Sequence, residues 1–413
     1  MKSFQSLLFL AFLSFAACSC NRSSTSGILI INIDEALKSR GTFKLSQIAD
    51  DVEFIQLHGM DNQTYIKPGS YNYVVGLEAI LVLNYDPLEV LLFSRNGSFI
   101  RKISQQGKGP GEFTGSLVAG LNNANRTLLI CDNSGKKFLL FDFEGNCLIE
   151  RQYQDVVNVN LFWIGGVRID ENENFVLCNG SPPSQGKKTY DLLIFDKNLS
   201  FLTGINEKPP KGGSPQMFTG SLPRIIELNG EIHYWSKGQD TIFRITDNYK
   251  PEPVQLILNL APAVWDDLHS RIISGNTSLS NILETKQCII IEGSREETPF
   301  IVVFDKGTGK GQQVQTNSMC GIPMFEKTIG IENDLFGFGP IFLSDYITLQ
   351  NKKMVLILHP GMVEWIEENI KGRFTDCLQA STVLLPDKRD ELIRIIKNLD
   401  ENSGPVLMVV KLK

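Results

Sequence analysis

The chain contains few of the histidine and cysteine residues, in suitable spacings, that metal binding and redox chemistry require. It contains four histidines, and no two of them share a helical or hairpin spacing: His58, His233, His269 and His359. The cysteines beyond residue 20 include no Cys-x-x-Cys pair: Cys131, Cys147, Cys178, Cys288, Cys320 and Cys377. The sequence therefore predicts neither a metal site nor a cofactor. Three cysteines lie in apolar strand-like runs and are expected to be small core residues: Cys131, Cys178 and Cys288.

Three further absences exclude classes of function. Beyond the N-terminus no run of 18 apolar residues exists, so no spanning helix is expected. The net charge is −6 and no Lys/Arg block exceeds three residues, which argues against nucleic acid as a partner. Gly-x-Ser-x-Gly is also absent, which argues against a fused α/β-hydrolase.

The first 20 residues have the pattern of a lipoprotein signal peptide. Lys2 is followed by an apolar stretch, Leu7 to Ala17, of signal-peptide length. Cys18 and Cys20 each follow mostly small residues, so either one fits the acylated first residue of a mature lipoprotein. An ordinary secretory signal is the alternative. Residues 21–27 form a polar tether, so the chain is expected to be anchored to a membrane.

A β-hairpin recurs along the remaining residues, 28–413. Its clearest copy is Leu91 to Ile103, where Asn96-Gly97 separates two strand-like runs. A phenylalanine marks the same phase in each copy, in steps of 48, 54, 48 and 61 residues: Phe93, Phe141, Phe195, Phe243 and Phe304. Between the copies lie near-continuous apolar strands, as expected of strands buried on both faces. One hairpin copy together with the neighbouring apolar strands is therefore predicted to form one four-stranded propeller blade.

The chain ends predict how the ring closes. Pro405 to Leu412 is a strand without a downstream partner, and Ile28 to Asn32 and Val52 to Leu57 are spare strands near the start. Pairing of N- and C-terminal strands completes a six-bladed β-propeller of the all-β class. Short helical insertions are expected at about 263–273 and 361–399. An open β-sandwich array is the alternative.

The chain resembles a known family in the motifs just described. The strand Ser46 to Leu57, the hairpin ending Asn96 to Ile103, and the Gly107 to Phe113 motif resemble the six-bladed β-propeller lipoproteins of Bacteroidetes. These are NHL-repeat-like, TolB-like propellers, and Asp240 to Ile245 is a second hallmark. The resemblance covers Ser46 to the C-terminus. It implies a fold and a compartment, and no catalytic residue follows from it.

The glycines of Gly107-x-Gly109-x-Gly111 could be mistaken for a phosphate-binding loop. Such a loop leads from a strand into a helix, whereas Pro110 interrupts this one and a strand follows. We expect the glycines to turn the chain from the outer edge of one blade to the inner strand of the next.

A non-catalytic binding or scaffold protein is the simplest hypothesis for the function. Propellers present loops around one mouth, where aromatic and planar polar side chains can bind a glycan or peptide. The candidate ligand-binding residues are Phe162, Trp163, Asp170, Asn179, His233 and Trp235. For the aromatic residues core packing is the alternative role, and for Asp and Asn a role in turns.

A metal-dependent lactonase or lyase is the alternative function. Such an enzyme needs oxygen or nitrogen ligands from several blades that converge on one channel mouth. The residues available for this are Asp132, Asp170, Asn179, His233 and Asp345. We expect a monomer in the cell envelope, with a membrane and envelope proteins as partners. It is expected to face the periplasm, and display on the cell surface is the alternative.

Overall fold

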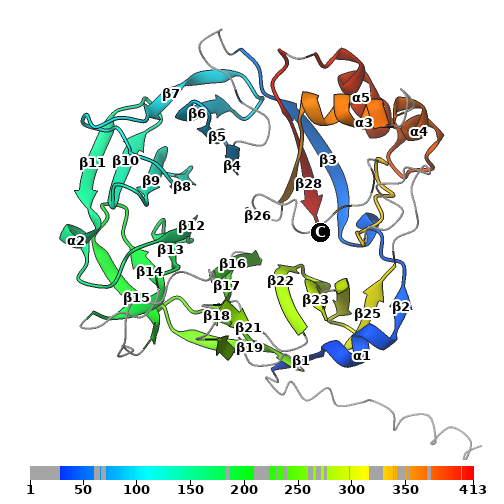
Figure 1. Ribbon diagram of the computed structural model, residues 1–413, viewed down its shortest axis with the longest axis horizontal. Coiled ribbons are helices and arrows are strands. Elements are labelled where there is room, and N and C mark those ends of the chain that lie inside the picture. Colours follow the sequence, from blue (N-terminus) through cyan, green and yellow to red (C-terminus); the bar gives the residue numbers. More distant parts are fainter. Residues whose placement is uncertain are drawn as a thin grey trace, which may run out of the picture.

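The computed structural model describes residues 28–59, 66, 71–181, 187–208, 223–228, 231–236, 240–258, 264–266, 271–273, 277–296, 298–315, 329–337, 339, 341, 349–350, 353–369, 374–400 and 402–413. Six sheets stand around a central channel as the blades of a β-propeller (Figure 1). Each blade holds four antiparallel strands ordered from the channel to the rim. The predicted fold class is confirmed. Cys18, Cys20, the tether 21–27 and Asp345 lie outside the described residues.

The strand bounds follow the chain from blade to blade. Blade 1 contains β4 (Tyr71–Val75), β5 (Ala79–Tyr85), β6 (Leu88–Ser94) and β7 (Phe99–Gln105). Blade 2 contains β8 (Leu117–Asn122), β9 (Thr127–Asp132), β10 (Lys137–Asp142) and β11 (Cys147–Gln152), followed by the short helix α2 (Tyr153–Val156). Blade 3 contains β12 (Ile164–Ile169), β13 (Phe175–Asn179), β14 (Thr189–Phe195) and β15 (Phe201–Lys208).

The last three blades also take up the N-terminal segment. Blade 4 contains β16 (Pro223–Leu228), β17 (Glu231–Ser236), β18 (Thr241–Ile245) and β19 (Pro251–Leu258). Blade 5 contains β22 (Thr277–Glu284), β23 (Cys288–Arg295), β24 (Thr298–Asp305) and β25 (Lys310–Val314). Blade 6 contains β26 (Leu349–Gln350), β27 (Lys353–Leu358), β28 (Val406–Leu412) and β3 (Ala49–Gln56).

The phenylalanine repeat marks the third strand of each of the first five blades. The residues lie on β6, β10, β14, β18 and β24: Phe93, Phe141, Phe195, Phe243 and Phe304. In blades 1 to 4 the pairing with the outer strand shifts register just before this residue. Such a shift bends the outer strand and increases its twist. The repeat predicted from sequence is therefore the structural repeat.

Ring closure occurs as predicted, with one of the two spare N-terminal strands. Strand β3 pairs antiparallel with β28, from Val406 opposite Gln56 to Leu412 opposite Ala49. The other spare strand, β1 (Leu29–Asn32), does not enter blade 6. It adds to the rim of blade 4 as a fifth strand, parallel to β19.

The N-terminal segment then crosses the outside of three blades. Helix α1 (Ile33–Lys38) follows β1, and β2 (Arg40–Gly41) adds a parallel strand to β25 in blade 5. The 3-10 helix η1 (Leu45–Gln47) precedes β3 in blade 6. Ile31 and Ile33 of this segment are fully buried against the blades. Asp34 forms an ion pair with Arg295 of blade 5 at 2.6 Å. The segment therefore joins blades 4, 5 and 6.

Apolar contacts between neighbouring blades hold the ring together. The buried apolar side chains of the described residues form six clusters, and each cluster lies between two neighbouring blades. The cluster between blades 5 and 6 also takes in the helices at the rim, whereas the cluster between blades 3 and 4 has the fewest buried members. Because strands here are covered on both faces, their sequences lack polar alternation. Cys131, Cys178 and Cys288 are buried, as expected.

The prediction of a helix at 263–273 is wrong. Within 263–273 the described residues form two short antiparallel strands, β20 (Val264–Asp266) and β21 (Arg271–Ile273). Val264, Ile272 and Ile273 are β-branched, which favours a pleated strand over a helix. The second insertion is confirmed as α3 (Pro360–Asn369), α4 (Phe374–Ala380) and α5 (Pro386–Asn398). Leu392, Ile393 and Ile396 of α5 pack onto blade 6.

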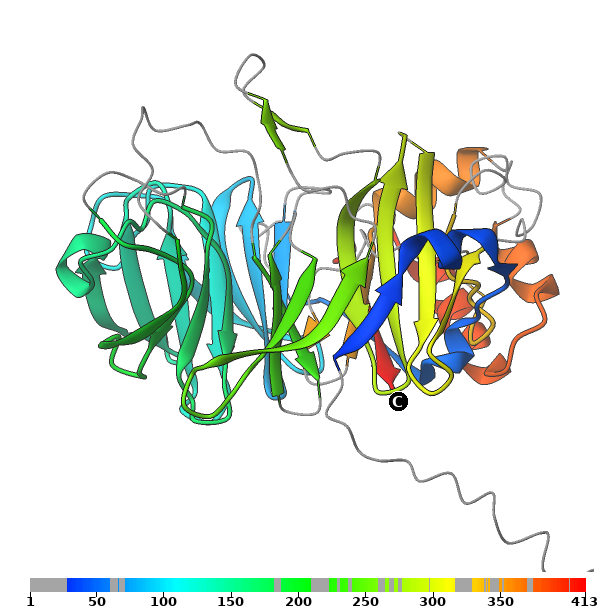
Figure 2. The ribbon, with the colours of Figure 1, turned by 90° about the horizontal axis from the view of Figure 1, so that it is seen from below.

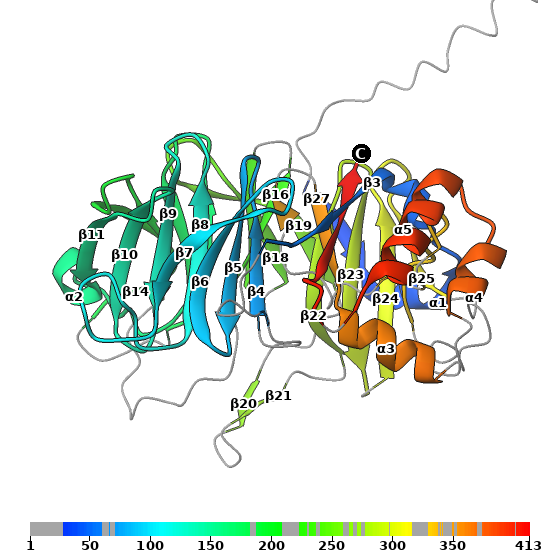
Figure 3. The ribbon, with the colours of Figure 1, turned by 90° about the horizontal axis from the view of Figure 1, so that it is seen from above.

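The ring has two distinct faces. We call "turn face" the side that carries the tight turns after the first and third strands, such as residues 170–174 and 246–250. The opposite "loop face" carries the connections between blades and after the second strands. The C-terminus lies on the turn face, whereas β20 and β21 project from the loop face (Figures 2 and 3). No helix among the described residues is long and apolar enough to cross a membrane.

Candidate functional site

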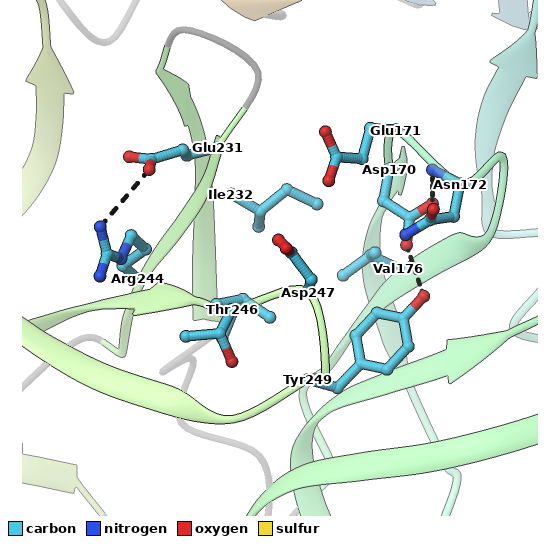
Figure 4. A pocket seen from close by; sticks show the side chains of 11 residues that line it. Asp170, Glu171, Asn172, Val176, Glu231, Ile232, Arg244, Thr246, Asp247 and Tyr249 are labelled. Carbon is cyan, nitrogen blue, oxygen red and sulfur yellow. Dashed lines mark hydrogen bonds and ion pairs between the residues drawn. The ribbon is translucent and has the colours of Figure 1, made fainter.

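A pocket of about 500 Å³ opens on the turn face between blades 3 and 4 (Figure 4). It lies over the interface with the fewest buried apolar side chains. Its lining consists of Asp170, Glu171, Asn172, Val176, Glu231, Ile232, Arg244, Ile245, Thr246, Asp247 and Tyr249. The β12–β13 turn of blade 3 meets the start of β17 and the β18–β19 turn of blade 4 here.

Asp170 and Tyr249 connect the two blades at this pocket. The Asp170 carboxylate accepts hydrogen bonds from the backbone N–H groups of Asn172 at 2.9 Å and Asn174 at 2.8 Å, which closes the β12–β13 turn. Its second oxygen accepts a hydrogen bond from the Tyr249 hydroxyl at 2.7 Å. Burial and this negatively charged neighbour raise the pKa of Tyr249 to about 12. Tyr249 is therefore a neutral hydrogen-bond donor at physiological pH.

The pocket is acidic over an apolar floor. Its carboxylates are Asp170, Glu171, Glu231 and Asp247, and its floor contains Val176, Ile232 and Ile245. Arg244, its one cationic side chain, is already bonded to Glu231 at 3.4 Å and to Glu252 at 2.7 Å. Such a lining can accept hydrogen bonds from a cationic group. Among the described residues, no three His, Cys, Asp or Glu side chains are arranged to hold a metal ion.

A second cavity, of about 230 Å³, lies in the central channel. It is bordered mainly by β4, β8, β12 and β16, the innermost strands of blades 1 to 4: Asn72, Tyr73, Val74, Leu83, Leu117, Val118, Ala119, Gly165, Gly166, Val167, Arg168, Cys178 and Ile225. The innermost strands run from the loop face to the turn face, and most of the lining residues on them lie in the first half of the strand. The cavity therefore lies toward the loop face. Gly165 and Gly166 border it without side chains, and the nearest side-chain atom to a Cβ on Gly166 would be Cys178 Sγ at 3.6 Å.

Phe162, Trp163 and Asn179 gather at the loop-face end of the first hairpin of blade 3. The Ser181 hydroxyl accepts hydrogen bonds from the backbone N–H groups of Phe162 at 2.6 Å and Trp163 at 3.2 Å. Phe162 is 52% exposed, and Lys136 Nζ lies 3.8 Å from its ring centroid. Burial lowers the pKa of Lys136, although Asp132 partly opposes this. These aromatic residues thus stand on the loop face, directly before the innermost strand β12.

The side chains of Asn179 and Asp170 form hydrogen bonds with backbone groups in and around that hairpin. Asn179 is fully buried and its amide nitrogen donates to the carbonyl oxygens of Asn160 at 3.2 Å and Tyr190 at 2.9 Å. Asp170 closes the turn at the opposite end of the hairpin, on the turn face. The predicted ligand-binding residues therefore do not form one site.

His233 and Trp235 lie inside the protein. Trp235 is fully buried in the apolar cluster between blades 4 and 5, which contradicts its predicted contact with a ligand. It belongs to the core because its strand is covered on both faces. His233 is 4% exposed, and its Nδ1 lies 2.7 Å from the Glu284 carboxylate in blade 5. His233 thus connects two blades.

Glu284 is the centre of a buried polar network that the sequence did not reveal. Besides His233, it accepts hydrogen bonds from Lys306 Nζ at 2.6 Å and Gln255 Nε2 at 2.5 Å. Burial alone would raise the pKa of Glu284, but the hydrogen bond from His233 and the charges of His233 and Lys306 hold it below its usual value. The carboxylate that directly follows Ile282 and Leu283 was the available signal, since buried acids are normally paired.

The described carboxylates that were candidate metal ligands already accept hydrogen bonds from backbone N–H groups. Asp132 is fully buried and accepts hydrogen bonds from the N–H groups of Thr114 at 2.8 Å and Gly135 at 2.9 Å. This joins blade 2 to the loop that precedes it. Asp345 cannot be placed because it lies outside the described residues.

The glycine loop binds a carboxylate of its own chain. It joins β7 to β8, as predicted, and the Glu112 carboxylate accepts a hydrogen bond from Gly109 N–H at 2.7 Å. That hydrogen bond lowers the pKa of Glu112. A Cβ on Gly107 would lie 1.9 Å from a Glu112 oxygen, so the loop needs glycine there to approach the carboxylate. The space that a phosphate would need is filled by Glu112.

The chain resembles several solved structures at low sequence identity. An exported protein, so described, from Bacteroides fragilis aligns with a TM-score of 0.60 at 15% identity, over 94% of this chain and all of that one. A DUF4221 family member from Bacteroides vulgatus aligns at 12% identity over 88% of this chain and 97% of that one, with a TM-score of 0.46. Virginiamycin B lyase from Staphylococcus aureus aligns at 10% identity over 65% and 75%, with a TM-score of 0.37.

Sequence comparison identifies a family. No curated protein matches this sequence. One family model, described as a domain of unknown function, DUF4934, matches residues 28–411, which is nearly the whole described propeller. The chain therefore belongs to the DUF4934 family.

Proposed function

We propose that this protein is a non-catalytic binding or scaffold protein of the cell envelope. In this proposal Cys18 or Cys20 is acylated and holds the propeller at a membrane, facing the periplasm. The ligand is a glycan or a peptide, and it binds at the loop-face mouth of the central channel. The family resemblance and the similarity to a Bacteroides fragilis protein described as exported support the compartment.

The observation that carries the binding proposal is the central cavity and its surroundings. The cavity lies toward the loop face, where Phe162 presents a 52% exposed ring. An exposed aromatic face beside a channel suits stacking on a sugar ring or an apolar side chain. Gly165 and Gly166 border the cavity without side chains, so their backbone groups can contribute hydrogen bonds to its lining. Trp163, next to Phe162, is the residue we propose for ligand contact.

A glycan and peptide array tests this site. Wild-type protein should retain ligands that Trp163→Ala loses. Trp365→Ala is the matched control, because Trp365 is 46% exposed on α3 at the rim and away from the channel. Equal loss in both variants, or binding that persists in Trp163→Ala, would contradict a ligand at this mouth.

Acylation is tested separately with radiolabelled palmitate. The wild-type protein should incorporate the label, and the Cys18→Ala, Cys20→Ala double variant should not. Equal labelling of both would reject the anchor. Elemental analysis, with a melt in the presence and absence of EDTA, addresses the metal-dependent lactonase or lyase alternative. A stoichiometric metal whose removal lowers the melting temperature would support the enzyme instead, because a ligand that binds only the folded state stabilises it.

A further inference from the structure

The direction of β1 determines from which side the N-terminal chain reaches the propeller. Strand β1 is parallel to β19, with Leu29 opposite Gln255 and Asn32 opposite Leu258. Strand β19 begins after the 246–250 turn on the turn face and runs toward the loop face. Because β1 has the same direction, Leu29 lies at its turn-face end, and the chain enters β1 from that side. Figure 2 shows β1 rising from that side, where the C-terminus also lies.

The position of this approach is fixed by the packing of the segment that follows. Ile31 and Ile33 are fully buried, Ala36 is 1% exposed, and β2 is paired with β25 in blade 5. The chain from β1 to β3 is thus bound to blades 4, 5 and 6. Residue 28 is therefore held close to the rim of the ring, because the segment that follows it is packed against the blades.

The average span of the tether is smaller than the height of the ring. Ile28 lies eight positions after Cys20 and ten positions after Cys18. A fully extended chain of that length reaches at most about 29 to 36 Å, and a flexible one spans roughly 14 to 19 Å on average. The eight-residue strand β19 alone is about 26 Å long. A lipid attached at either cysteine would hold the turn face nearer to the membrane than the loop face.

The surface at this point is partly apolar. Ile28 is 45% exposed and Ile30 is 54% exposed on the rim of blade 4, whereas their neighbour Ile31 is buried. Exposed isoleucines next to a lipid anchor suit the membrane interface, where apolar side chains add to the binding of an acyl chain.

We propose that the turn face of the propeller faces the membrane and that the central cavity opens away from it, on the loop face. This inference rests on the lipid anchor in the proposed function. It places Phe162, Trp163 and the projecting strands β20 and β21 on the side that meets ligands from the envelope space. The acidic pocket of Figure 4 then lies on the membrane side.

Energy transfer from the protein to the membrane tests the orientation. Acylated full-length protein is reconstituted on vesicles of phosphatidylcholine and phosphatidylglycerol that contain a lipid labelled on its headgroup. A donor dye is attached through a genetically encoded azide residue at Asn198 or at Gln154. Both positions are exposed and close to blades 2 and 3, but Asn198 lies in a turn of the turn face and Gln154 lies in α2 on the loop face. Transfer should be several-fold greater from Asn198.

The outcomes separate the orientation from the anchor. Flotation of the protein with vesicles and equal transfer, or greater transfer from Gln154, would overturn the orientation while the anchor stands. Failure of the protein to float with vesicles would overturn the anchor and the orientation with it. The Cys18→Ala, Cys20→Ala double variant is the control that should not float. Insertion of a long Gly/Ser segment after Ser26 should reduce the difference between the two positions, because reach grows with linker length; an unchanged difference would contradict the role of the tether.

Discussion

Removal of the Glu284 carboxylate should destabilise the propeller by about 3–5 kcal/mol, the usual cost of breaking a buried ion pair from one side. The Glu284 side chain is 1% exposed and lies between His233 of blade 4 and Lys306 of blade 5. In Glu284→Ala both partners, with Gln255, lose the acceptor that compensates for their burial. The interface between blades 4 and 5 would then contain uncompensated polar groups.

Urea unfolding followed by tryptophan fluorescence measures this loss. The matched control is Glu78→Ala, which removes a carboxylate from an ion pair with Arg126 whose side chains are 55% and 54% exposed. Exposed pairs of this kind contribute about 0–1 kcal/mol. If Glu284→Ala costs no more than Glu78→Ala, the network does not stabilise the ring and the reasoning is refuted.

The same network predicts a pH dependence. The pKa of Glu284 is lower in the folded protein than its ordinary value of 4.5, so the folded state binds this proton less readily than the unfolded chain. Its contribution is complete above the unfolded pKa and is lost as the pH falls through the folded pKa. The stability difference between wild type and Glu284→Gln should therefore be largest near about pH 7 and should shrink in acid. A difference that grows as the pH falls would contradict the assigned direction.

Two other changes test the hairpin turn and the closure of the ring. Gly97 has φ +91° and a Cβ there would lie 2.1 Å from the Gln56 carbonyl oxygen, whereas Gly309 has φ +70° and nothing within 4 Å. Gly309→Ala should cost only about 1–2 kcal/mol for the left-handed backbone, and Gly97→Ala clearly more; equal urea midpoints would contradict the steric argument. Deletion of Pro405–Lys413 removes five side chains of β28 that are at most 1% exposed. At about 1.5–3 kcal/mol each this rivals the roughly 5–15 kcal/mol stability of a domain, so a cooperative, wild-type melt would reject closure by β28.

The sequence by itself determined the architecture, because blades are built from local pairings. A turn such as Asn96-Gly97 joins strands that are neighbours in the chain, and the five phenylalanines repeat with the blade. The strands without local partners at the two ends predicted closure, and β3 with β28 confirms it. The helices expected at about 361–399 are α3, α4 and α5, and buried side chains of α5 pack onto blade 6. Each of these follows from the spacing of apolar residues along a short stretch.

Only the tertiary structure decided which polar side chains meet. His233 contacts Glu284, 51 residues away, and Asp170 contacts Tyr249, 79 residues away. Such contacts depend on the rotation of one blade against the next, which no local pattern specifies. The partner of β1 was likewise undetermined, since an apolar strand fits more than one open edge. The short segment at 263–273 could follow either a helical or a strand pattern, because a few apolar residues fit both periods and only their pairing distinguishes them.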